Sequence, residues 1–191
     1  MKVVEGIDLR SKRLQTVLTA RRWSAKGVAA VIDTETTDLF GRVCEVAAID
    51  AHTGRVLIDT LVNPEVPNRA THIHGITDAM VADAPTWEEV LPKLRRGLAG
   101  RTLLAYNSEY DRSVIASHTE SIGRSPGRLA DAENWWCLME ARSAWGRHRR
   151  YHLGGGHRAL GDCEAAKDIL AWVAEGRGVI TVEPQSSSPA T

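Results

Sequence analysis

The feature that most constrains the fold is a series of three short apolar segments near the start of the chain. Residues 28–33 (VAAVID) form an uninterrupted apolar run that ends in an acid, which is typical of a strand buried on both faces. Residues 43–50 and 56–62 form two further runs, separated by the turn-prone sequence His52-Thr53-Gly54. Three strands in succession with short connections predict an antiparallel meander.

From residue 86 the pattern changes to alternating helices and strands. Thr86 can cap a helix that runs to Leu98, with Glu89 at the capping-box position and Gly100 beyond its end. The elements expected after it are a strand over 102–106, a helix over 108–117, a short strand over 135–138 and a helix over 160–174. A meander followed by this alternation predicts an α/β fold with one mixed sheet, part antiparallel and part parallel, flanked by helices.

The two ends of the chain are expected to lie outside this sheet domain. Residues 8–24 predict an amphipathic helix that Gly27 closes, because apolar side chains recur at helical spacing at Leu9, Leu14, Val17 and Leu18. From residue 183 the sequence EPQSSSPAT is small and polar, which favours disorder. We therefore expect an N-terminal helical extension (1–27), one main domain (28–175) and a polar tail (176–191).

Composition excludes several protein classes. The chain has 191 residues, 43% hydrophobic and 25% charged, and no apolar run approaches the roughly 20 residues of a membrane-spanning helix. Its first residues mix acids and bases, unlike a secretory signal, so we expect a cytoplasmic protein with no membrane partner. Cys44, Cys137 and Cys163 are odd in number and lack C-x-x-C spacing, which predicts reduced, packed thiols.

Charge is balanced overall but segregated along the sequence. The 24 basic and 24 acidic residues cancel, yet residues 9–32 contain six basic residues and no acid. Residues 33–65 contain seven acids, and residues 141–161 contain five arginines, three histidines and no acid. This order suits a metal site that handles a phosphate chain. Solvated helix faces are the alternative explanation for either basic segment.

The acids with the clearest chemical signal are Asp33 and Glu35. Side chains at i and i+2 of a strand point to the same face, so the two carboxylates converge. Two like charges beside an apolar strand require a cation or a proton, unless the pair simply faces water. Asp111, in the helix after the fourth strand, and Asp162, near the start of the last helix, can reach the same edge of the sheet.

Four ordered segments resemble the DEDDh 3′–5′ exonucleases, the DnaQ-like group that includes the proofreading epsilon subunit of bacterial DNA polymerase III, ribonuclease T and oligoribonuclease. The segments are residues 33–37 (DTETT), 74–77 (HGIT, followed by APTW at 84–87), 107–111 (NSEYD) and 157–162 (HRALGD). Their order and spacing extend the resemblance over about residues 28–173, most of the chain. Each segment alone is common, and the specificity comes from all four together.

The resemblance implies a ribonuclease H-like fold and two Mg²⁺ or Mn²⁺ ions held by Asp33, Glu35, Asp111 and Asp162. In this pattern one ion, on Asp33, Glu35 and Asp162, activates the attacking water. The other, shared through Asp33 and assisted by Asp111, supports the departing 3′ oxygen. Four carboxylates also balance the charge of two hard divalent cations.

The resemblance further implies that His157 is the general base, because it stands five residues before the last aspartate. A sister subgroup has a tyrosine at the position of Arg158. His148 and His152 lie on the same loop without a supporting motif. The loop includes Gly154-Gly155-Gly156, so His157 is expected to be able to swing into place.

Substrate contacts are also implied by the family pattern. Thr36, Thr37 and Leu39 are expected to border the 3′ nucleotide, and Asn107 to orient the strand. His74 or Ile76 is expected to touch the base or sugar, with a loop-structuring role for His74 equally open. Tyr110 is expected to pack and not to bind. The acid-free loop predicts a phosphate-binding surface at Arg147, Arg149 and Arg150.

Two further features need interpretation. Asp38 stands where the family usually has glycine; aspartate tolerates left-handed backbone, so the turn is expected to persist, with an added negative charge near the phosphate. The pair Trp135-Trp136 allows base stacking. Its place on a short inner strand favours core packing instead.

The implied activity is metal-dependent release of nucleoside 5′-monophosphates from the 3′ end of single-stranded DNA or RNA, with a DNA polymerase as a possible partner. Two alternatives stay open. One is a catalytically silent relative that only binds nucleic acid or a polymerase, although such a relative typically lacks one of the five site residues. The other is a ribonuclease H-fold endonuclease or strand transferase, which would make products longer than one nucleotide.

Overall fold

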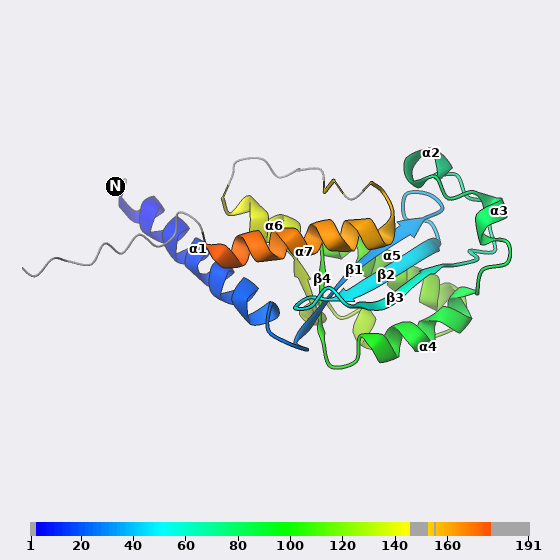
Figure 1. Ribbon diagram of the computed structural model, residues 1–191, viewed down its shortest axis with the longest axis horizontal. Coiled ribbons are helices and arrows are strands. Elements are labelled where there is room, and N and C mark those ends of the chain that lie inside the picture. Colours follow the sequence, from blue (N-terminus) through cyan, green and yellow to red (C-terminus); the bar gives the residue numbers. More distant parts are fainter. Residues whose placement is uncertain (1–2, 146–152, 155, 177–191) are drawn as a thin grey trace, which may run out of the picture.

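The computed structural model describes residues 3–145, 153–154 and 156–176, and within them the chain forms one central sheet covered by helices (Figure 1). The strands are β1 (Ala29–Thr36), β2 (Val43–Asp50), β3 (Val56–Leu61), β4 (Thr102–Ala105) and β5 (Trp135–Cys137). The helices are α1 (Val3–Trp23), α2 (Thr71–His74), α3 (Asp78–Val81), α4 (Trp87–Gly97), α5 (Ser108–Ser121), α6 (Leu138–Ser143) and α7 (Ala159–Glu175), with 3₁₀ turns at Gly127–Leu129 and Ala132–Asn134.

The sheet has the strand order β3-β2-β1-β4-β5. β1, β2 and β3 pair antiparallel, whereas β1 pairs with β4 and β4 with β5 in parallel. The predicted mixed sheet is confirmed. β1 continues to Thr36 instead of ending at Asp33, because it stays paired with β2 up to the Thr36–Val43 pair. Its pairing with β4 stops earlier, at Val31 of β1. The end of β1 therefore has a sheet neighbour on one side only.

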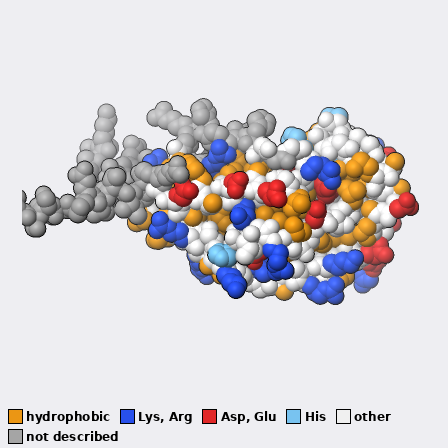
Figure 2. Space-filling model, viewed as in Figure 1, with side chains coloured by type: hydrophobic (Ala, Val, Ile, Leu, Met, Phe, Trp, Pro, Cys, Tyr) orange, Lys and Arg blue, Asp and Glu red, His pale blue; other side chains and the backbone are white. Residues whose placement is uncertain are grey.

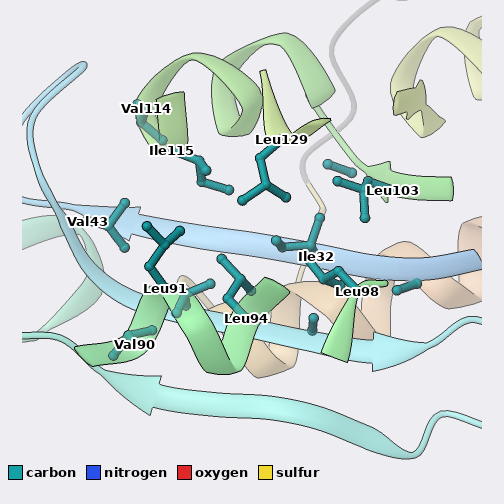
Figure 3. Close-up of a cluster of buried hydrophobic side chains, with 14 of the residues drawn as sticks. Ile32, Val43, Val90, Leu91, Leu94, Leu98, Leu103, Val114, Ile115 and Leu129 are labelled. Carbon is teal, nitrogen blue, oxygen red and sulfur yellow. The ribbon is translucent and has the colours of Figure 1, made fainter. Parts of the chain in front are cut away.

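Alternate residues of the inner strands supply two separate cores. Ile32 belongs to the core that α4 and α5 cover, where Leu94 and Ile115 pack (Figure 3). Its neighbour Val31 belongs to the opposite core, beneath α7, together with Leu170. Burial of both faces explains why the first strand reads as a continuous apolar run.

The capping-box prediction for α4 is confirmed, since the Thr86 N–H donates to Glu89 Oε2 at 2.8 Å. Helices α2, α3 and α6 were not predicted. They are four to six residues long, too short for a helical period to register in the sequence.

The N-terminal helix differs from its prediction. α1 packs against α7, and its Val17 is wholly buried, but Leu14 is 40% and Leu18 55% exposed. The reason is a narrow contact: a Cβ on Gly176, at the end of α7, would lie 3.1 Å from Val17 Cγ1. The Arg21 guanidinium also donates to the Ala174 carbonyl at 2.9 Å. Among the residues of α1 whose side chains are described, the compact Val17 and Ala20 are wholly buried, and hydrogen bonds from Arg13 and Arg21 add to their contact with the domain.

The cysteines and tryptophans behave as packing residues. Cys44 and Cys163 are buried free thiols, and Cys137 is a partly buried one. Trp135 is buried and donates from Nε1 to the Leu129 carbonyl at 2.9 Å, which agrees with its predicted place in the core. In the described part of the chain, we find no helix with the length and apolarity needed to cross a membrane.

A buried histidine ties α5 to the sheet. His118 is 2% exposed, stacks on the indole of Trp87 at a centroid distance of 5.2 Å, and accepts a hydrogen bond from the Val43 N–H at 3.2 Å. Burial lowers the pKa of His118 to about 4, and the positive charge of Arg42 adds to this. The fold therefore holds this imidazole neutral.

We expect His118 to make folding stability depend on pH. Its pKa is lowered on folding, so its contribution is complete above about pH 6.5 and is lost as pH falls toward 4, at a cost on the order of 3 kcal/mol. The free energy of unfolding in urea, measured at pH 7 and pH 4.5, should fall more for wild type than for His118→Gln. The exposed His72→Gln variant is the control and should follow wild type. Parallel curves for wild type and His118→Gln would contradict the assignment.

Candidate active site

Three acids from two distant segments meet at the end of β1. Asp33 and Glu35 point from β1 toward α7, and Asp162 lies in the first turn of α7. One carboxylate oxygen from each lies within 4.8 Å of the others. Alternation along the strand puts Asp33 and Glu35 on the face that α7 covers, which is why all three converge.

The fourth acid approaches from the opposite face of the sheet. Asp111 is in the first turn of α5 and is 3% exposed. Its Oδ1 accepts a hydrogen bond from Thr34 Oγ1 at 2.9 Å. Since Thr34 lies between Asp33 and Glu35 on β1, this bond fixes Asp111 beside the three-acid group.

These carboxylates repel one another strongly. Burial raises the pKa of Asp33 well above its usual value, and the charges of Asp111 and Asp162 raise it further. Burial also raises the pKa of Glu35 to about 7, with Asp162 as the next cause. It raises the pKa of Asp111 to about 7 as well, against the opposing effect of the Thr34 hydrogen bond. The group therefore needs protons or cations near neutral pH.

The donor set fits hard divalent cations. All four side chains offer carboxylate oxygens, the ligands that Mg²⁺ and Mn²⁺ prefer, and none offers sulfur or imidazole. The three converging acids come from a rigid strand and a helix start, which supports a defined coordination geometry. The cluster can therefore hold a divalent metal ion between β1 and α7.

A small cavity opens beside Glu35. It has a volume of about 150 Å³ and is lined by Thr34, Glu35, Thr36, Asp38, Leu39, Ala70, Ile73, His74 and Tyr110. Its mouth is apolar, because Leu39 is 74% and Ile73 52% exposed. The cavity thus combines an acidic wall with a hydrophobic rim.

The hydroxyl groups of Thr36 and Thr37 both form hydrogen bonds within the protein. Thr36 Oγ1 lies 2.6 Å from the Tyr110 hydroxyl, at the wall of the cavity. Thr37 is 3% exposed, and its Oγ1 accepts from the Arg42 N–H at 3.1 Å. The placement of Thr37 therefore differs from that expected of a nucleotide contact: its side chain holds the turn over residues 37–42.

The turn after β1 uses a different left-handed residue from the one expected. Asp38 is exposed and accepts from the Leu39 N–H at 2.8 Å, whereas positive φ occurs at Phe40 (61°). Phe40 is 64% exposed, and its ring lies 5.6 Å from that of Tyr110. Sequence analysis missed Phe40, although an apolar pair in an otherwise polar turn was a usable signal. Tyr110 both packs and lines the cavity.

The HGIT segment braces the site from behind. His74 is 6% exposed; its Nε2 lies 3.2 Å from the Thr36 carbonyl, and its Nδ1 accepts from the Ile76 N–H at 3.0 Å. Ile76 is wholly buried in a small core with Cys44. The Ile76 side chain therefore does not face the cavity, whereas His74, the other candidate for contact with a base or sugar, lines it. His74 links its own loop to the end of β1.

The remaining expected site residues divide into described and undescribed ones. His157 precedes α7, is exposed, and has a positive φ of 55°. Asn107 is the exposed residue that begins α5, with no side-chain capping bond. Arg147, Arg149 and Arg150 lie outside the described residues, as do His148 and His152.

On the face in Figure 2, acidic side chains follow α7 and basic ones gather along the lower edge.

Sequence analysis also missed an ion pair at the start of α7. Glu45 of β2 is buried and accepts from the guanidinium of Arg158 and from the Ala159 N–H. Both partners were visible in the sequence, but no pattern joins residues so far apart. Along the chain, Arg158 lies between His157 and Asp162.

The sequence of this chain matches those of known proteins. Residues 30–170 match the family model described as "Exonuclease". The chain is 32% identical to an uncharacterized exonuclease of Escherichia phage 186, over 76% of this chain and 87% of that protein. It is 30% identical to exodeoxyribonuclease 10 of Escherichia coli K12, over 81% of this chain and 75% of that protein.

A solved structure agrees with the sequence matches. Exonuclease X in complex with 5′ overhanging duplex DNA aligns with a TM-score of 0.60 and 31% identity, covering 79% of this chain and 93% of that one. The family model spans the acidic cluster, the cavity and the start of α7. The chain therefore belongs to the exonuclease family of the DnaQ-like, DEDDh type.

Proposed function

We propose that this chain is a metal-dependent 3′–5′ exonuclease that releases nucleoside 5′-monophosphates from single-stranded DNA or RNA ends. The observation that carries the proposal is the meeting of Asp33, Glu35 and Asp162 within 4.8 Å, with Asp111 linked to them through Thr34. A purely structural cluster of acids would be neutralised by basic partners. Here the strongest effects on the pKa values of Asp33 and Glu35 are burial and the charges of neighbouring acids.

Each acid has a distinct role in this proposal. Asp33, Glu35 and Asp162 hold one Mg²⁺ or Mn²⁺ ion, and Asp33 and Asp111 hold a second. When bound, the two ions stabilise charge on the attacking and departing oxygens of the phosphodiester. His157 takes the proton from the attacking water, since an imidazole nitrogen can accept a proton and this one is exposed immediately before α7, the helix that carries Asp162.

The cavity is the proposed site of the terminal nucleotide. Its acidic wall places the 3′ phosphodiester near the metal ligands, while Leu39, Ile73 and Phe40 offer apolar contact to a base. Asn107 is exposed at the start of α5 and can orient the strand. The arginines at 147, 149 and 150 remain the proposed phosphate contacts of the neighbouring loop.

The names of the relatives favour DNA as the substrate. One is an exodeoxyribonuclease, and the solved exonuclease X structure holds a duplex DNA with a 5′ overhang. RNA stays the second substrate to test. A polymerase partner is a further proposal, supported by 37% identity over 134 residues to a DNA polymerase III subunit epsilon-like protein of Rhodobacter capsulatus, of which the chain covers 19%.

Direction, metal requirement and product size can be tested together. With DNA and RNA oligonucleotides labelled at the 5′ or the 3′ end and Mg²⁺ or Mn²⁺, we expect the 5′ label to show a ladder that shortens from the 3′ end and the 3′ label to appear in mononucleotides, both abolished by a chelator. Asp33→Asn and Asp162→Asn should lower the rate by more than about 100-fold, beyond the loss caused by a supporting residue of a metal site. The exposed Asp168→Asn on the same helix is the control and should retain the rate. Oligonucleotide products would instead indicate an endonuclease, and an inactive wild type a silent relative.

Removing one buried charge should stabilise the metal-free protein. Asp111→Asn relieves repulsion on Asp33, so we expect its melting temperature in chelator to rise by a few degrees, about 1 kcal/mol for a chain of this size. The same variant should gain less stability from added Mn²⁺ than wild type does. Glu109→Gln, which changes an exposed acid two residues away in the same turn, should change neither value. A lower melting temperature for Asp111→Asn in chelator would contradict the repulsion.

The apolar rim should affect substrate binding more than turnover. Phe40→Ala removes an exposed ring beside the cavity, so we expect KM for a single-stranded oligonucleotide to rise about tenfold, the size of one stacking contact, with little change in kcat. Val56→Ala, an exposed residue of β3, is the control and should leave KM unchanged. An unchanged KM for Phe40→Ala would exclude the ring from the binding surface.

A further inference from the structure

Glu45 is a buried acid with an unusually complete set of partners. It is 3% exposed near the start of β2. Both of its carboxylate oxygens accept from Arg158 Nε at 3.1 Å, Oε1 also accepts from Nη2 at 2.5 Å, and Oε2 accepts from the Ala159 N–H at 2.9 Å. A bidentate contact of this kind fixes orientation as well as distance.

The register of the sheet places this pair beside the acidic cluster. Glu45 is the antiparallel partner of Glu35, so both side chains project from the same face of neighbouring strands. Two like charges in directly opposed positions are destabilising. The guanidinium of Arg158 offsets this, since it donates to both carboxylate oxygens of Glu45.

The same contact fixes the beginning of α7. Arg158 is the residue that precedes the helix, and Ala159 is its first residue. The Asp162 N–H donates to the Arg158 carbonyl at 2.9 Å, so the turn that carries Asp162 is built directly on the anchored residue. The Glu45 carboxylate also lies at the helix N-terminus, where a negative charge is favourable.

His157 directly precedes Arg158 in the chain. It has a positive φ of 55°, a conformation that costs energy for a residue with a side chain. Gly154 and Gly156 before it also have positive φ, and glycine leaves the backbone wide freedom. Arg158, the residue after His157, is thus the point at which the chain is held to the sheet, through its ion pair with Glu45.

We propose that the Glu45–Arg158 pair positions His157 and Asp162 relative to Glu35 during the reaction. Glu35 and Glu45 pair across neighbouring strands. The first is a proposed metal ligand, and the second forms the ion pair that positions the general base and Asp162. Glu45 and Arg158 are positioning residues, acting through their neighbours and not on the substrate. This inference rests on the proposed function, and it adds two residues that the acidic cluster and His157 do not include.

The kinetic test compares two ion pairs whose buried acids, Glu45 and Asp50, both lie on β2. Glu45→Gln removes the charge at the site, and we expect kcat to fall about 10- to 100-fold with KM within about twofold, as for loss of a supporting residue. Arg158→Lys keeps the charge without the fork and should retain more kcat than Arg158→Ala. The matched control is Asp50→Asn, which breaks the 2.8 Å Asp50–Arg101 pair at the other end of β2. It should lower the melting temperature but leave kcat unchanged.

A second measurement on the metal-free protein separates positioning from activity. Hydrogen exchange should accelerate at the amides of residues 156–162 in Glu45→Gln, and not in Asp50→Asn. Failure of wild type to release mononucleotides would overturn the proposed function itself. If wild type is active, the positioning role is overturned by a kcat for Glu45→Gln equal to that of Asp50→Asn, or by unchanged exchange at these amides.

Discussion

The repulsion among four nearly buried carboxylates is the interaction on which the rest of the structure depends. Burial and the charges of neighbouring acids, Asp162 among them, raise the pKa values of Asp33, Glu35 and Asp111, so the metal-free cluster opposes folding at and above neutral pH. The two cores on either side of β1 must hold the acids together against that force. Bound divalent cations reverse its sign, which couples metal binding to stability.

The acidic cluster is accessible from both sides because the pairings of β1 with β2 and with β4 end at different residues. β4 leaves β1 after Val31, which gives the first turn of α5 access to Thr34 and brings Asp111 in from one side. β2 stays paired to the end of β1, so Glu45 lies opposite Glu35 and ties α7 to the other side. The unequal length of the two pairings of β1 therefore shapes the site.

Sequence reasoning succeeded where the signal was local or matched an ordered motif. The apolar run of β1, the capping box of α4 and the convergence of Asp33 with Glu35 each follow from short-range periodicity. It was less successful where a residue's surroundings decide its role. Ile76 and Thr37 look like pocket residues in the motif, but the fold uses the first in a core and the second in a turn. Leu18 fits a buried helical stripe, yet α1 meets α7 along its small residues.

The sequence alone determined the class of fold, the family and the identity of the acids, because alternation, turn chemistry and ordered motifs are properties of neighbouring residues. The tertiary structure alone decided that Phe40 is an exposed ring beside the cavity and that His74 braces the end of β1. It also decided that Glu45 anchors Arg158, 113 residues away. Such contacts depend on strand register and helix placement, which arise only when distant segments pack and which leave no periodic trace in the chain.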